Sequence, residues 1–277
     1  MTSCSVLRTV EEGRNCLSET EAIVLSLSQF IRERGLFMSK TRKRYMVRLV
    51  LRCCVFVLCC LGAVFAPEQF AVLEGMNFFR SFSWLHLLWL VWVLDTLQQI
   101  VPIKNKLPLG SMKLFANRFR PIRDRINYEA LRSYIITTTK AAYKVFLLYT
   151  ALILAIGLLY WGGLVNKTGL FLFSACFYVC DLICVLIWCP FRLLMRTRCC
   201  TTCRIFNWDH LMMFSPLIFM GGFYATSLVV LAAIAWLVWE VCIMMYPERF
   251  WDKSNAALKC SECTDKLCTQ YCQKLRK

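Results

Sequence analysis

The sequence predicts an all-α, polytopic membrane protein: a transmembrane helix bundle of five to six spans, with an N-terminal amphipathic helix and a short cysteine-rich C-terminal tail. Hydrophobic residues make up 58% of the 277 residues. Several apolar runs reach the roughly 20 residues that a helix needs to cross a bilayer. The basic residues lie between these runs, which is typical of the loops of a membrane protein and not of a soluble domain.

The net charge of +16 follows from this arrangement. Lys and Arg cluster in the segments between the apolar runs, as the positive-inside rule describes for cytosolic loops. The lipid bilayer with its anionic headgroups is therefore the expected electrostatic partner. A nucleic-acid partner is not expected.

Residues 1–40 are expected to form a cytosolic amphipathic segment. Ser18 and Glu21 have the spacing of a helix capping box. Five apolar side chains then fall on one helical face: Ile23, Val24, Leu27, Phe30 and Ile31. This segment lacks the apolar core of a cleaved signal peptide, and the basic residues before the first span place the N-terminus in the cytosol.

Two transmembrane hairpins are expected, over residues 41–103 and 145–198. The segment between them, 104–144, is basic and interleaved with aromatic residues, which suits a cytosolic segment lying on anionic headgroups. The four expected spans are about 47–66, 82–103, 145–165 and 170–191.

The last apolar block, 211–246, is too long for one crossing, because a straight helix over it would measure roughly 54 Å. Pro216 and the pair Gly221 and Gly222 predict a break inside it. Two short spans would return the tail, 247–277, to the cytosol, whereas one span would leave it outside. The basic residues of the tail favour the cytosol, and the sequence therefore predicts six crossings.

Two groups of cysteines predict a metal site on the cytosolic face. Cys200 and Cys203, in the motif segment 199–210, form one C-x2-C pair, and Cys260 and Cys263 form another. Together the two pairs have the four-thiolate formula of structural zinc sites. The tail also has four local thiolates that suit zinc or an iron–sulfur cluster. The predicted ligands are Cys200, Cys203, Cys260, Cys263, Cys268 and Cys272, with Cys189 as an additional candidate.

The redox compartment decides between two states of these cysteines. A cytosolic tail keeps its thiols reduced and available to a metal, whereas a tail outside the cell would form two disulfides. Cysteines inside the spans are expected to act as small hydrophobic residues.

The motif Cys184-x4-Cys189-Pro190, followed by further cysteines, resembles the membrane-bound polyferredoxins that accompany nitrate and nitrous-oxide reductases. The resemblance covers residues 184–203 and 260–272. It implies electron transfer between quinone and iron–sulfur centres, with a redox partner. The spacing before the Cys-Pro step is longer here than in that family, and its two regular ferredoxin runs are absent.

Asp95 and Asp181 lie within apolar runs. A carboxylate inside a bilayer costs about 2.5–3.5 kcal/mol on insertion scales and usually faces a bundle interior or a water path. The two residues are therefore candidates for a proton relay or cation site, unless each is neutral or bonded to neighbouring polar groups. Glu240 is a weaker third candidate. His210 could join a cysteine metal site, but its place beside Trp208 predicts an interfacial anchor.

Three functions follow from these features. The leading hypothesis is a membrane protein with a cysteine-ligated zinc or iron–sulfur site, serving electron transfer or structural anchoring, with a redox partner or a second copy of the chain as partner. The second is a small transporter or channel component that uses Asp95 and Asp181. The third is a membrane thiol–disulfide oxidoreductase in which Cys200 and Cys203 react beside Arg198 and Arg204. The sequence contains none of the usual phosphate-loop, dinucleotide or hydrolase motifs.

Overall fold

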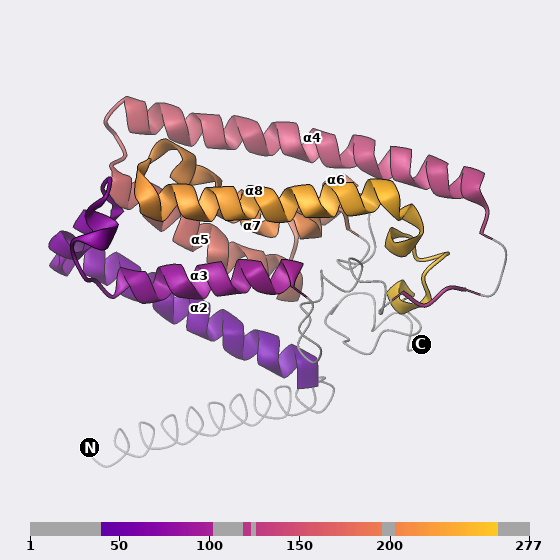
Figure 1. Ribbon diagram of the computed structural model, residues 1–277, viewed down its shortest axis with the longest axis horizontal. Coiled ribbons are helices and arrows are strands. Elements are labelled where there is room, and N and C mark those ends of the chain that lie inside the picture. Colours follow the sequence, from indigo (N-terminus) through magenta and orange to yellow (C-terminus); the bar gives the residue numbers. More distant parts are fainter. Residues whose placement is uncertain (1–39, 102–118, 123–125, 196–202, 260–277) are drawn as a thin grey trace, which may run out of the picture.

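The computed structural model describes residues 40–101, 119–122, 126–195 and 203–259 (Figure 1). These residues form helices, with one isolated β-bridge between Pro121 and Asn255 and no β-strand among them. The predicted all-α class is therefore confirmed for this part of the chain. The predicted N-terminal amphipathic helix and the cysteine-rich end of the tail lie outside the described residues.

In the described part, four helices are long and apolar enough to cross a membrane: α2 (Lys40–Phe65), α4 (Tyr128–Trp161), α5 (Lys167–Leu186) and α8 (Gly222–Met245). A fifth apolar helix, α3 (Leu85–Ile100), has 16 residues. At about 1.5 Å per residue, α3 is shorter than the roughly 30 Å hydrocarbon layer. The chain is thus a multi-pass helical membrane protein.

Shorter helices complete the bundle. They are η1 (Pro67–Leu73), η2 (Asn77–Phe79), α6 (Pro190–Met195), η6 (Ile205–Asn207), α7 (Asp209–Phe214), η7 (Ser215–Phe219), η8 (Pro247–Phe250) and η9 (Ala256–Leu258). Helix α2 packs on α5, α3 packs on α8, and α7 packs against both α5 and α8.

Large aromatic side chains fill the centre of the bundle. Trp92 of α3 lies 5.6 Å from Phe171 of α5 and 5.4 Å from Phe214 of α7, measured between ring centroids. Phe171 also meets Tyr224 of α8 at 6.0 Å. Each such pair contributes about 0.5–1.5 kcal/mol beyond its buried area. These contacts hold α3, α5, α7 and α8 together.

Helix α4 begins before the span that the sequence predicts for it. Asn127 caps its first turn by accepting a hydrogen bond from the backbone N–H of Ala130 at 3.0 Å, so the helix starts at Tyr128. Its 34 residues measure about 51 Å, which exceeds a bilayer. Part of α4 therefore lies outside the hydrocarbon layer. Near the start of α4, Tyr134 stacks on Trp251 with 5.8 Å between the ring centroids.

The last apolar block contains the break that Pro216 and the glycines predict. Helix α7 ends at Phe214, η7 carries Pro216 near its start, and α8 begins at Gly222. Gly221 and Gly222 have φ of 67° and 76°. This backbone region favours glycine because a Cβ would clash there.

The two ends of the bundle hold different parts of the chain (Figure 1). At the Gly75 end, on the left, the loop from η1 to η2 contacts the starts of α5 and α8: Lys167 pairs with Glu74 at 3.3 Å, and the Phe223 N–H donates to the Gly75 carbonyl at 3.0 Å. At the opposite end, which we call the Asp209 end, lie the start of α2 and the ends of α3, α5 and α8.

Candidate functional site

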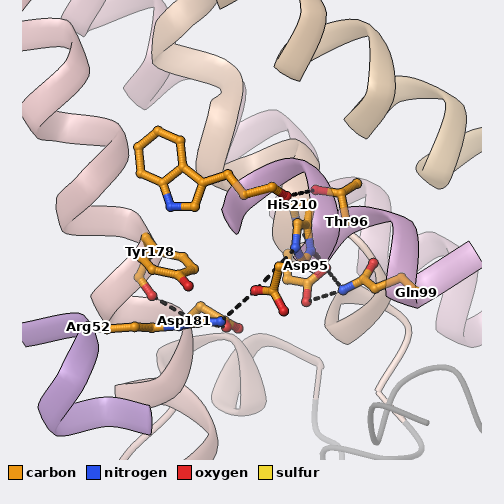
Figure 2. A network of polar contacts seen from close by, with 9 residues as sticks. Arg52, Asp95, Thr96, Gln99, Tyr178, Asp181 and His210 are labelled. Atoms are coloured by element: carbon orange, nitrogen blue, oxygen red, sulfur yellow. Dashed lines mark hydrogen bonds and ion pairs between the residues drawn. The ribbon is translucent and has the colours of Figure 1, made fainter. Parts of the chain in front are cut away.

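Arg52 of α2 joins two carboxylates inside the bundle (Figure 2). Its Nη2 donates to Asp95 Oδ2 at 3.0 Å, and its Nη1 donates to Asp181 Oδ2 at 2.8 Å. Nη1 also donates to the backbone carbonyl of Tyr178 at 2.8 Å, and the guanidinium carbon lies 3.7 Å from the centre of the Tyr178 ring. The Arg52 side chain is 12% exposed. The structure thus brings together the two intramembrane carboxylates that the sequence predicts as a site.

His210 of α7 continues this arrangement on the other side of Asp95. Its Nε2 lies 3.8 Å from Asp95 Oδ2, and its Nδ1 lies 3.1 Å from Asp209 Oδ1. Gln99 of α3 then donates through Nε2 to both carboxylate oxygens of Asp209, at 3.0 and 2.8 Å. Both ring nitrogens of His210 face a carboxylate, and only the imidazolium form donates from both.

These side chains form one continuous row, which we call the polar network: Asp181, Arg52, Asp95, His210, Asp209 and Gln99 (Figure 2). They come from α2, α3, α5 and α7. Asp95 and Asp181 each lie in the last two turns of their helices, and Asp209 begins α7. The polar network therefore lies towards the Asp209 end of the bundle.

The charges of the polar network do not cancel. Three carboxylates, of Asp95, Asp181 and Asp209, contact one guanidinium and one imidazole. With His210 charged, the direct contacts among the described residues leave an excess of one negative charge. Arg48 attracts Asp95 from a longer range but is exposed. An excess charge in a buried site is costly, so this arrangement favours binding of a proton or a cation.

A cavity of about 490 Å³ adjoins the polar network. It lies between α4, α5, α7 and the segment that leads into η6. Asp181 and Asp209, the carboxylates at the two ends of the ion-paired row, both line it. The remaining wall is almost entirely apolar and sulfur-containing, and its cysteines are Cys180, Cys184, Cys189 and Cys203.

A second charged cluster holds the segment beside this cavity. Arg204 bonds to Glu240 of α8 and to Thr139 of α4, and the indole N–H of Trp208 donates to Glu240 Oε1 at 2.9 Å. Glu240, the weaker intramembrane candidate from the sequence, thus ties η6 to α8. Arg204, predicted beside a reactive thiol pair, is bound to a carboxylate.

The structure places only part of the predicted metal site. Cys203 is buried, at 6% exposure, beside Ile205 and Trp208, and Cys189 lines the cavity. The other predicted ligands lie outside the described residues: Cys200, Cys260, Cys263, Cys268 and Cys272. Within the described part of the chain, no group of three His, Cys, Asp or Glu side chains is arranged to hold a metal ion.

The segments that lead to the two predicted cysteine pairs do approach each other. Arg204 and Asn207, which follow Cys203, line a small cavity together with Phe250, which lies near the start of the tail. Tyr134 of α4 lines the same cavity. The zinc or iron–sulfur site stays a prediction, and metal analysis of the purified protein is its direct check.

Sequence reasoning missed most of the polar network. Arg52, Gln99 and Asp209 were not singled out as site residues. The prediction that His210 is an interfacial anchor was wrong, because its side chain is 7% exposed and lies between two carboxylates. One feature of the sequence could have predicted this network. Arg52 falls within an apolar run, and Asp95 and Asp181 fall within two other apolar runs.

Comparison with known proteins found no family model, no curated protein and no solved structure that matches the chain. The resemblance to membrane-bound polyferredoxins therefore stays an expectation from residues 184–203 and 260–272.

Proposed function

We propose that this chain is a proton-coupled membrane transport protein in which the polar network takes up and releases a proton. The observation that carries this proposal is the buried row of three carboxylates joined by Arg52 and His210. Ionisable groups inside a membrane bundle are expensive, and proton pathways are one of their principal uses. The excess negative charge of the row supplies the driving force for proton binding.

His210 is the group suited to pass the proton. An imidazole can accept a proton at one nitrogen and release one at the other, and its two nitrogens face Asp209 and Asp95. The gap of 3.8 Å to Asp95 exceeds a hydrogen bond. A movement of roughly 1 Å between α3 and α7 would close it. Arg52 remains charged and keeps Asp95 and Asp181 in place.

The side chains of the polar network come from four helices, and this supports its coupling to transport. Protonation of Asp95 or Asp181 would weaken its attraction to Arg52, and therefore the attraction of α3 or α5 to α2. A change of charge at one site can in this way alter the packing of several helices, which is how switching proteins convert local electrostatics into movement.

We also propose six crossings. Helices α2, α3, α4 and α5 supply four, α7 with η7 supplies the fifth, and α8 supplies the sixth. The start of α8, which directly follows η7, contacts Gly75. This contact places the end of η7 near the Gly75 end of the bundle and so supports a crossing by this short segment. The Asp209 end would then face the cytosol, because the basic start of α2, with Arg42, Lys43 and Arg44, lies there.

Infrared difference spectroscopy of the purified protein tests the proton site. A protonated carboxyl group has a carbonyl stretch that a carboxylate lacks. We expect this band to grow as the pH falls, and to be reduced in Asp181→Asn, which removes a carboxyl group of the polar network that also lines the cavity. The matched control is Glu74→Gln, which removes a carboxylate that is 58% exposed at the Gly75 end and should leave the band of the buried carboxyl unchanged.

The functional readout is proton uptake by proteoliposomes that contain a pH-sensitive dye and carry an imposed membrane potential. Asp181→Asn should lose most of the uptake, and Glu74→Gln should keep it. A wild-type protein with no titrating buried carboxyl and no proton uptake would overturn the proposal.

A further inference from the structure

We propose that the cavity beside the polar network binds a lipophilic organic cation, a molecule with an apolar body and a single positive charge. This inference rests on the proposed transport function and deepens it by naming the class of substrate. It is carried by the shape of the cavity, by the two carboxylates in its wall and by its access from the lipid-facing surface.

The cavity lies where α4 and α5 separate. The two helices are joined by the tight turn at residues 162–166 and diverge towards the Asp209 end (Figure 1). The space of about 490 Å³ between them falls within the range of small-molecule sites, which run from about 300 to 1,000 Å³. Such sites are mainly apolar with a few polar groups that fix the ligand, and this cavity has that composition.

The polar groups of the cavity select a positive charge. Asp181 and Asp209 keep 20% and 15% of their side-chain surface exposed, and both line the cavity. Arg52 and His210, the two cationic partners in the network, are not among the residues that line it. A ligand in the cavity therefore meets carboxylates, and the excess of one negative charge matches one monovalent cation.

Aromatic side chains in the wall of the cavity also favour a positively charged ligand. Tyr149 and Phe177 both line the cavity, with ring centroids 6.1 Å apart. The face of an aromatic ring attracts a cation. The Tyr149 hydroxyl is held by the backbone carbonyl of Met212 and by Ser215, so the position of this ring is fixed from α7 and η7.

The cavity is accessible from the outer surface of α4. Leu148 and Leu152 line it and are 62% and 48% exposed. Both lie in the apolar part of a membrane-spanning helix, so their exposed surface faces lipid. A lipophilic cation concentrates in a bilayer and can enter the cavity between α4 and α5 from there.

Equilibrium dialysis of the purified full chain against tetraphenylphosphonium tests this inference. Tetraphenylborate is the matched control ligand, because it has the same shape and apolar surface and the opposite charge. We expect saturable binding of one tetraphenylphosphonium per chain and no saturable binding of tetraphenylborate. Asp209→Asn should weaken the binding of tetraphenylphosphonium roughly tenfold or more, because a charged contact is lost.

A second variant covers the case in which Asp209→Asn does not fold. Leu152→Trp places a large ring at the mouth of the cavity from an exposed position, so it should block binding and leave the core intact. Glu74→Gln should bind like the wild type. The inference would be overturned by equal binding of the two ions, or by wild-type affinity in both Asp209→Asn and Leu152→Trp.

The experiments distinguish a failure of the proton-coupled function from a failure of the cation-binding cavity. If the buried carboxyl titrates and protons are taken up but tetraphenylphosphonium does not bind, the substrate class is wrong and the proton site stands. If tetraphenylphosphonium binds as expected but no buried carboxyl titrates, the cavity is a cation site and the proton-coupled function is wrong.

Discussion

Arg52 offsets the repulsion between two buried carboxylates, those of Asp95 and Asp181, by bonding to both of them. Asp95 and Asp181 belong to different helices, and each donates no hydrogen when ionised, so neither can stabilise the other directly. The guanidinium meets both of them and the Tyr178 carbonyl with separate N–H groups. A lysine has one ammonium and cannot reproduce this planar geometry. At the residue scale, the stability of the polar network therefore depends on Arg52.

Arg52→Gln should destabilise the protein by roughly 3–5 kcal/mol, because removing one partner leaves buried charges unpaired. Denaturation in a titration with sodium dodecyl sulfate, followed by circular dichroism, measures this change. Adding Asp95→Asn to Arg52→Gln should restore part of the loss. The control is Lys167→Gln, which breaks an exposed pair with Glu74 and should cost about 0–1 kcal/mol. Equal losses for Arg52→Gln and Lys167→Gln would refute this account.

The start of α8 is positioned by a close backbone contact. A Cβ on Gly222 would lie 2.9 Å from the backbone nitrogen of Gly75 and 3.0 Å from its carbonyl oxygen. Helix α8 can therefore approach the loop after η1 only because position 222 has no side chain. Helix η1, just before this loop, contributes Phe70, Val72 and Leu73 to the core, although it falls between two predicted spans.

Gly222→Ala should destabilise the bundle more than Gly163→Ala. Both glycines have positive φ, 76° and 75°, so each substitution has a similar backbone cost of about 1–2 kcal/mol. A Cβ at position 163 meets no atom within 4 Å, whereas at position 222 it meets the backbone of another segment. The difference between the two variants, measured by the same denaturation, isolates the contact. Equal destabilisation would show that Gly222 matters only for its backbone conformation.

Six crossings place the described ends of the chain on one side of the membrane. The turn before α5 and the segment after α8 would then lie on opposite sides. Lys167 and Lys253 report these two places, and both are solvent-exposed. At the scale of the whole molecule, the number of crossings can therefore be tested by finding on which side of the membrane each of these lysines lies.

A membrane-impermeant amine reagent added to intact cells should modify Lys167 and spare Lys253. Both lysines should be modified after the membrane is permeabilised, as measured by mass spectrometry of the labelled peptides. The reason is that, in the proposed arrangement of six crossings, residues 209–219 cross the membrane before α8 returns. Modification of both lysines in intact cells would exclude six crossings with this orientation.

The sequence by itself determined the class of the protein and the break in the last apolar block. Both depend on local properties: the length of an apolar run sets whether a helix can cross a bilayer, and proline and glycine act on the backbone where they stand. Asp95 and Asp181 could be chosen as site candidates for the same reason, because a carboxylate within an apolar run is costly wherever it packs.

Only the tertiary structure decided what surrounds these carboxylates. Arg52 and Asp181 are 129 residues apart in the chain, and Gln99 and Asp209 are 110 apart. The packing of α2, α3, α5 and α7 brings them together, and the divergence of α4 from α5 makes the cavity. Helical periodicity shows which residues share a face of one helix. It does not show which face of another helix they meet, and the polar network and its cavity depend on that pairing.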